Sequence, residues 1–99
     1  MFSIRSNIEG EKALVSISGR LDTVTAPETE KGIKELLPRI TELVFDFSEL
    51  EYISSAGLRV LLSTQKAMSG KGGMRLTNVN ETVMEIFEVT GFTDILTID

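Results

Sequence analysis

The stretch from Leu43 to Met68, LVFDFSELEYISSAGLRVLLSTQKAM, constrains the fold more than any other part of the chain. It opens with an apolar run, residues 43–47, that predicts a buried strand. A loop over residues 48–57 follows and ends in a turn of small residues. Beyond it, apolar side chains recur at the spacing of one helical face, and three of them are expected in the core: Leu58, Leu61 and Leu62. The stretch therefore predicts a strand, a loop and a helix that begins at a pair of serines.

The two serines, Ser54 and Ser55, stand where that helix begins, and two roles are open to them. A serine hydroxyl at this place commonly caps the helix, because it accepts a hydrogen bond from an unpaired N–H group of the first turn. The same N–H groups and the helix dipole also favour negative charge, so a serine here can carry a phosphoryl group. Local chemistry makes capping the more common role and leaves phosphorylation as the alternative.

The length and charge of the chain limit the classes of partner. Ninety-nine residues predict one small domain, residues 1–99, with a single core. A formal net charge of -5 argues against a nucleic-acid surface, which needs clustered lysine and arginine, and against an anionic membrane face. No segment has the length of a membrane span or a signal peptide, so we expect a cytoplasmic protein with neither nucleic acid nor membrane as a partner.

Cysteine and histidine are both absent from the sequence. Their absence removes disulfides, thiolate chemistry and the usual ligands of zinc, iron and copper. It also excludes nucleophile arrangements of the serine-histidine-aspartate and cysteine-histidine kinds, so any catalysis would have to use carboxylates, lysines or hydroxyls. We expect no metal and no cofactor.

The N-terminal part predicts a hairpin followed by a helix. Residues 2–8 and 14–18 have strand patterns separated by a short turn, which is typical of an antiparallel hairpin. Residues 19–25 then predict a polar loop. Thr25 stands three residues before Glu28, a spacing that predicts a capping box at the start of a helix. Pro38 ends this helix near Leu37.

The C-terminal part adds a strand, a helix and a final apolar segment. Residues 69–73 are rich in glycine, and Gly70 is the expected left-handed end of the central helix. This run lacks the spacing of a phosphate-binding loop, and a turn explains its glycines. Residues 74–78 predict a strand, Asn78 or Asn80 caps a third helix that ends at Gly91, and residues 95–98 are expected to pack along a sheet edge.

These elements predict an α/β fold: a small mixed β-sheet of about four strands, with an N-terminal antiparallel hairpin and then alternating helices and strands, flanked by helices. Such folds place ligands and partners at loops that follow the carboxyl ends of strands. The loops over residues 19–25 and 48–57 both follow strand ends. We therefore expect these two loops to lie side by side.

Three separated segments, in the same order along the chain, resemble the STAS domain family and, within it, the stand-alone bacterial anti-sigma factor antagonists. The segments are GRLDTVTAP, VFDFSELEYISSAGLRVLL and VTGFTDIL. The resemblance spans nearly the whole chain and implies a mixed four-stranded sheet flanked by helices. It further implies that the protein binds an anti-sigma factor that is also a serine kinase, and so frees a sigma factor. Phosphorylation of a serine at the start of the central helix breaks that complex, and a serine phosphatase restores it.

The resemblance also assigns roles to particular residues. When the chain is aligned on Gly57 and Leu58, Ser55 is the implied phosphoacceptor, and in its unmodified form it caps the helix. Ser54 stands where most members carry aspartate and is the alternative acceptor. Asp22 takes the position of a functional aspartate of the family, where it either contacts the partner or forms an Asx-turn.

The predicted partner-binding surface gathers these residues with their neighbours. Arg59, one turn into the helix, is either a solvated side chain or a partner contact. The whole predicted surface is Asp22, Thr23, Ser54, Ser55, Ala56, Gly57 and Arg59.

Other functions fit the same sequence. STAS domains also serve as accessory subunits of transporters and as partners in other kinase–phosphatase circuits, including secretion and biofilm control. An enzymatic alternative is a weak nucleotide-binding or hydrolysing domain that uses Asp22, Asp46 and the turn from Ser54 to Gly57. The missing phosphate-binding loop argues against that alternative. We therefore predict a binding protein without catalytic residues, present as a monomer or a weak dimer.

Overall fold

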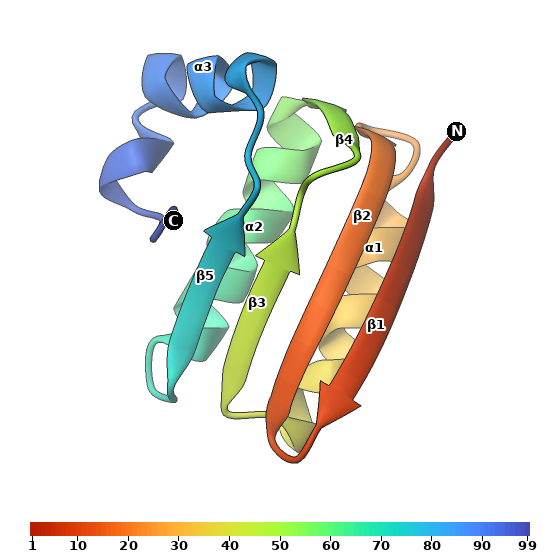
Figure 1. Cartoon of the computed structure of the whole chain (residues 1–99), viewed down its shortest axis with the longest axis vertical. Coiled ribbons are helices and arrows are strands. Elements are labelled where there is room, and N and C mark those ends of the chain that lie inside the picture. The colour runs from red at the N-terminus through yellow and green to blue at the C-terminus, as the bar shows by residue number, and fades with distance from the viewer.

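The computed structural model describes all residues from Met1 to Asp99 and contains a mixed sheet with helices on one of its faces (Figure 1). The strands are β1 (Ser3–Glu9), β2 (Lys12–Leu21), β3 (Glu42–Asp46), β4 (Leu50–Ile53) and β5 (Gly73–Thr77). The helices are α1 (Ala26–Leu36), α2 (Ser55–Met68) and α3 (Glu81–Thr90), with short 3-10 turns at Leu37–Arg39 and Phe92–Asp94.

The strands of the main sheet lie in the order β1-β2-β3-β5. The first two form the predicted antiparallel hairpin, while β3 runs parallel to both β2 and β5. Because the connections through α1 and α2 return to the same face, both helices start at one end of the sheet, where the parallel strands finish (Figure 1). The two helix starts therefore share one edge of the molecule.

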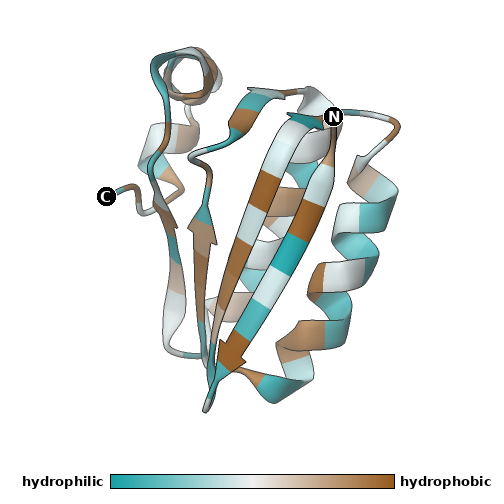
Figure 2. Cartoon of the chain, turned by 45° about the vertical axis from the view of Figure 1, so that its right-hand side comes forward, coloured by the Kyte–Doolittle hydropathy of each residue, from teal (hydrophilic) through white to brown (hydrophobic).

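The core lies between the sheet and the helices α1 and α2. It is a cluster of 22 buried residues, among which Phe45, Phe47 and Phe87 are the largest that are fully buried. Figure 2 shows hydrophobic and polar segments alternating along β1 and β2, as expected for strands with one face on a core. The opposite face of the sheet carries no helix, and Leu14 is exposed there.

The main departure from the sequence-based prediction is a fifth strand. Residues 48–57 were expected to form a loop, yet Leu50–Ile53 form β4, which pairs in parallel with the last residues of β2. The expected loop from Gly19 is therefore shorter, since β2 continues to Leu21. The register shifts between Gly19 and Arg20, so that Leu50 and Ile53 both point into the core although three positions separate them. This irregularity hides the two-residue period by which a strand is recognised.

Three predictions about helices are wrong in detail. Thr25 forms no side-chain cap at α1, because its hydroxyl is engaged in the loop before the helix. The predicted core residue Leu62 is only partly buried, and Val60 is buried instead. Gly70 does not have the left-handed conformation; Gly73, at the start of β5, has a φ of 106°.

Other predictions are confirmed. Asn80 caps α3 by accepting a hydrogen bond from the N–H of Val83 at 2.9 Å. Gly91 ends that helix in the left-handed conformation, with a φ of 81°. The C-terminal segment packs along the free edge of β5, where Leu76 bridges to Ile98.

Candidate functional site

The candidate site lies at the edge where β2 and β4 end and α1 and α2 begin (Figure 1). The N–H of Ser54 donates to the carbonyl oxygen of Leu21 at 2.9 Å, and this hydrogen bond extends the pairing of β2 with β4 by one residue. The next residue on each side is Asp22 and Ser55. The predicted proximity of the two loops is therefore confirmed.

Ser55 is the first residue of α2 and is exposed. The N-cap position belongs to Ser54, which has an extended backbone, and neither serine side chain makes a capping hydrogen bond. The Oγ of Ser54 is buried and has no hydrogen-bond partner. The prediction that Ser55 caps the helix is therefore wrong: Ser55 is one position past the cap, and its hydroxyl faces solvent unengaged.

Gly57 allows α2 to start close to the strands. A methyl group at this position would lie 2.7 Å from Cγ1 of Ile53 and 2.8 Å from Cγ of Leu21, well inside van der Waals contact. Since the helix cannot approach β2 and β4 with any larger side chain there, glycine is required by packing. This close approach holds Ser55 and Ala56 beside the loop that carries Asp22.

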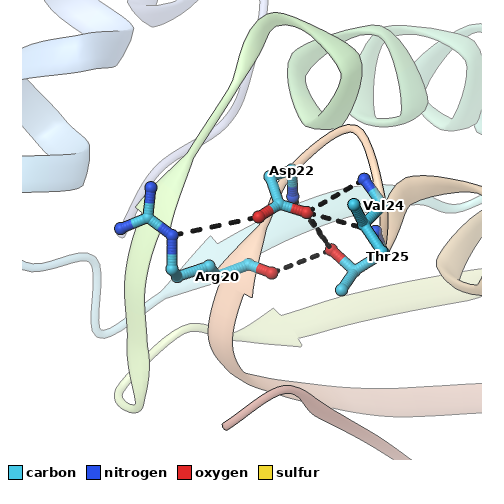
Figure 3. Close-up of polar contacts among 4 residues, drawn as sticks. All are labelled: Arg20, Asp22, Val24 and Thr25. Atoms are coloured by element: carbon cyan, nitrogen blue, oxygen red, sulfur yellow. Dashed lines mark hydrogen bonds and ion pairs between the residues drawn. The ribbon is translucent and has the colours of Figure 1, made fainter.

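Asp22 organises the loop between β2 and α1 (Figure 3). Its Oδ1 accepts hydrogen bonds from the N–H groups of Val24 at 3.0 Å and Thr25 at 3.2 Å, and from the Thr25 hydroxyl at 3.3 Å. The Thr25 hydroxyl also donates to the carbonyl oxygen of Arg20 at 2.8 Å. The Asx-turn interpretation of Asp22 is confirmed, and it leaves Val24 85% exposed at the tip of the loop.

These contacts keep the Asp22 carboxylate ionised. The hydrogen bond from the Thr25 N–H is the main reason why the pKa of Asp22 lies below its ordinary value of 3.8. Partial burial opposes this shift, while the Val24 N–H, the Thr25 hydroxyl and the charge of Arg20 add to it. The site therefore carries a fixed negative charge at neutral pH.

Arg20 lies beside this carboxylate on the outer surface of β2. Its Nε is 3.9 Å from Oδ2 of Asp22, and its guanidinium stacks 4.4 Å above the ring centroid of Tyr52 on β4. Nothing in the sequence pattern indicates this contact, because it depends on the register of β2 against β4. The stacking holds the Arg20 side chain in place beside Asp22.

A shallow groove of about 260 Å³ runs between the starts of α1 and α2. Thr23, Ala56 and Arg59, all predicted partner contacts, line it. Sequence reasoning did not find the other lining residues, which come mainly from α1: Ala26, Pro27, Glu30 and Val60. The segment Thr25-Ala26-Pro27 was the available signal for the residues of α1, since it predicts that a helix begins just after the loop that carries Thr23.

The structure does not assemble the nucleotide site that the sequence left open. Asp46 pairs with Ser16 in the last pair of the β2–β3 ladder. Asp22 lies six positions beyond Ser16, just past the end of β2, which is roughly 20 Å further along at the rise of a strand. Asn78, whose side chain donates to Asp46 at 3.0 Å, is the main cause of the lowered pKa of that carboxyl. Asp46 therefore accepts hydrogen bonds at the end of β3 and does not face the serine turn.

The glycine-rich turn lies away from the serines as well. The N–H of Gly72 donates to the carbonyl oxygen of Thr41 at 2.6 Å, which places this turn at the beginning of β3, the opposite end of the sheet. No three carboxylate side chains gather in a way that would hold a metal ion. What the edge offers is an exposed hydroxyl, a fixed carboxylate and a groove.

The fold and this edge together define a class: small α/β domains in which a helix start presents a hydroxyl between two loops. A family model described as "STAS domain" matches residues 3–99. The chain belongs to the STAS domain family.

Relatives of known name are similar over most of the chain. The "Anti-sigma-B factor antagonist" of Bacillus subtilis is 31% identical over 85 residues, which cover 85% of this chain and 78% of that protein. The "Putative anti-sigma factor antagonist BtrV" of Bordetella bronchiseptica is 35% identical over 77 residues, 77% of this chain and 60% of that protein.

Solved structures confirm the fold. A crystal structure of an anti-sigma factor antagonist from Mycobacterium paratuberculosis superposes with a TM-score of 0.89 at 24% identity, covering 99% of this chain and 85% of that one. The antagonist SpoIIAA in its unphosphorylated form superposes with a TM-score of 0.82 at 19% identity, covering 100% and 88% of the two chains. At these identities the likeness concerns the fold alone.

None of the helices is both long enough and apolar enough to cross a bilayer.

Proposed function

We propose that this protein is an anti-sigma factor antagonist that acts without catalysis of its own. In this proposal it binds an anti-sigma factor that is also a serine kinase, and so releases the sigma factor which that kinase holds. Phosphorylation of Ser55 ends the interaction, and a serine phosphatase resets the protein. The observation that carries the proposal is Ser55 itself, exposed and unengaged at the first position of α2 and next to the groove.

The surface around Ser55 suits close contact with another protein. Ala56 and Gly57 follow it, so no bulky side chain stands in front of the helix start. Thr23, from the neighbouring loop, lines the same groove as Ala56. Asp22 holds that loop in one conformation, with Val24 exposed. An ordered, small-residue surface favours binding, since little side-chain freedom is lost on contact.

A phosphate on Ser55 would change this surface without changing the fold. It adds roughly -1.5 to -2 charges and three acceptor oxygens. Within the protein the start of α2 tolerates that charge, because the helix dipole and its free N–H groups favour an anion. Across an interface, the same charge would be buried against groups not arranged to receive it and next to the carboxylate of Asp22. The cost is several kcal/mol, which is enough to dissociate the complex.

Comparison with relatives supports this assignment. The relatives from Bacillus subtilis and Bordetella bronchiseptica are named as anti-sigma factor antagonists, the second as a putative one, and SpoIIAA has been solved in a phosphorylated as well as an unphosphorylated form. The phosphorylated form superposes on this chain with a TM-score of 0.75. We infer a cytoplasmic protein, because the proposed kinase partner requires ATP. We also propose that the protein is a monomer or a weak dimer.

The proposal is tested by incubating the protein with ATP and its cognate serine kinase, followed by intact mass measurement and peptide mapping. We expect one phosphate on the peptide that contains Ser55. Ser55→Ala should abolish it and Ser54→Ala should not, because the Ser54 hydroxyl is buried and the Ser55 hydroxyl is exposed.

Two other results have clear meanings. A phosphate on Ser54 would mean that the acceptor is Ser54 and not Ser55, while control of binding by phosphorylation would still hold. If a kinase that binds the protein leaves both serines unmodified, the phosphorylation switch is wrong, and the protein is a constitutive binding module.

A further inference from the structure

Arg59 is the cation near Ser55 that has no other engagement. It lies one turn into α2, is exposed, and takes part in none of the ion pairs of the structure. Its side chain lines the groove between α1 and α2 opposite Glu30. Glu30 pairs with Lys34 on its own helix at 4.0 Å and forms no ion pair with Arg59. The guanidinium of Arg59 is therefore available to pair with an anion.

Helix geometry places Arg59 within reach of Ser55. The two residues are four positions apart on α2, which puts them on one face of the helix, about 6 Å apart along its axis. An anion that precedes a cation by four residues is the favourable orientation for such a pair. A phosphate on Ser55 and the fork of donors on Arg59 would meet in this arrangement.

The other charged groups around Ser55 do not compete for the same role. Asp22, from the loop before α1, is an anion and cannot act as a counter-ion for phosphate. Its Oδ1 already accepts hydrogen bonds from two backbone N–H groups and a hydroxyl. Arg20, from β2, is held between Asp22 and the ring of Tyr52. Moving Arg20 to the phosphate would cost both contacts, whereas moving Arg59 costs none.

We propose that Arg59 is the internal counter-ion of phosphorylated Ser55, and that phosphorylation withdraws its side chain from the groove between α1 and α2. The source of the phosphate rests on the proposed function; the pairing itself does not. One modification then alters the partner surface twice: it adds negative charge at Ser55, and it removes a positive side chain from the groove. Neither change requires a movement of the backbone.

The pairing is tested on protein that carries phosphoserine at position 55, introduced during translation so that no kinase is needed. The second ionisation of the phosphate is followed by ³¹P NMR as a function of pH. A nearby cation favours the dianion and lowers the pKa of the phosphate. Arg59→Gln should raise that pKa by about 0.2 to 0.4 of a unit relative to the unsubstituted protein.

Lys66→Gln is the matched control. Lys66 is exposed on the same helix and its substitution removes the same charge, but it lies eleven residues from Ser55. We expect Lys66→Gln to leave the pKa of the phosphate within about 0.1 of a unit, since exposed charges at that separation are largely screened. Equal pKa values in the Arg59→Gln and Lys66→Gln proteins would overturn the proposal.

A second measurement follows the arginines directly. In ¹H–¹⁵N spectra, phosphorylation should shift the Nε–H resonance of Arg59 more than that of Arg20. A shift confined to Arg20 would overturn the assignment of the counter-ion. A kinase that fails to modify Ser55 would count against the proposed function only, because the phosphoserine in these experiments does not depend on a kinase.

Discussion

The starts of α2 and α3 are built from similar residues and differ in almost every contact. Both helices are preceded by an extended N-cap residue, Ser54 in one and Asn80 in the other. Asn80 accepts a hydrogen bond from the N–H of Val83 and donates one to the carbonyl oxygen of Leu50, at 2.6 Å. Ser54 makes no side-chain hydrogen bond at all. At the next position α3 has an acid, Glu81, whereas α2 has the neutral Ser55.

Under the proposed function, this difference separates a helix start that serves stability from one that serves contact with other molecules. At α3 a cap and an acidic first turn satisfy the free N–H groups and the helix dipole. At α2 both means of stabilisation are missing, although the helix is the longer one and lies on the core. The start of α2 is therefore left open to a charged group that arrives from outside, and the rest of the helix supplies the stability.

The largest expected effect concerns charge at the first position of each helix. Ser55→Asp should weaken binding to the anti-sigma factor by at least about a hundred-fold, because the carboxylate would be buried at the interface without a partner. The melting temperature should change little, since Glu81 shows that an acid is accepted at the corresponding position of α3. Titration calorimetry and thermal unfolding measure the two quantities.

Glu81→Gln is the control for this substitution, because it changes charge at the other helix start. We expect binding to the anti-sigma factor to be unaffected. Unchanged binding of the Ser55→Asp protein would show that the start of α2 lies outside the interface.

The next effect concerns packing at the third position of α2. Gly57→Ala should lower the free energy of unfolding by about 1–3 kcal/mol, because the added methyl group overlaps Leu21 and Ile53. Urea unfolding measures it. Gly32→Ala in α1 is the matched control: its methyl group would meet only Cδ1 of Ile4 at 3.8 Å, so the better helix former should stabilise by roughly 0.5–1 kcal/mol. If both substitutions raise the free energy of unfolding, the space between Gly57 and the side chains of Leu21 and Ile53 is wide enough for a methyl group.

A smaller effect compares the two N-cap residues themselves. Asn80→Ala should lower the free energy of unfolding by about 1 kcal/mol, because the N–H of Val83 loses its acceptor. Ser54→Ala should change it by less than about 0.5 kcal/mol, since it removes a buried hydroxyl that has no partner. Denaturant unfolding of the two variants under identical conditions gives the difference. Equal losses would mean that Ser54 does cap α2 in solution.

The smallest expected effect tests the loop beside α2 through its dependence on pH. The pKa of Asp22 is lowered in the folded protein, chiefly by the Thr25 N–H. Its contribution to stability is therefore complete above the unfolded value of about 4 and is lost as the pH falls through the folded value. The difference in unfolding free energy between the native protein and Asp22→Asn should be constant from neutral pH to about pH 5 and shrink below about pH 4. A difference independent of pH would mean that the charge of Asp22 does not hold this loop.

Local sequence signals predicted most of the elements of this fold. The hairpin, the central strand, the helix that follows it and the left-handed glycine after α3 all have patterns contained within a few residues. The family resemblance likewise rests on short segments, and the matching family model covers residues 3–99. The predicted proximity of the loops followed from the rule that the ends of parallel strands meet at one edge.

The predictions that were wrong depended on contacts that the local sequence pattern does not reveal. β4 exists because β2 continues far enough to pair with it, and the register shift beside Gly19 conceals its pattern. Thr25 has the spacing of a capping residue, but Asp22 and Arg20 engage its hydroxyl. In the first case a pairing between distant segments decided the structure, and in the second case hydrogen bonds within the loop outweighed a capping preference of about 1 kcal/mol.

The sequence by itself determined the α/β class, the place of the serine pair and the absence of histidine and cysteine chemistry, because these depend on residue types and on periods of a few residues. Only the tertiary structure decided which serine hydroxyl is exposed, since that depends on how closely α2 approaches Leu21 and Ile53 across Gly57. It likewise decided that Arg20 is engaged and that Arg59 is free. Side-chain engagement depends on partners from other strands and helices, and a single stretch of sequence does not contain them.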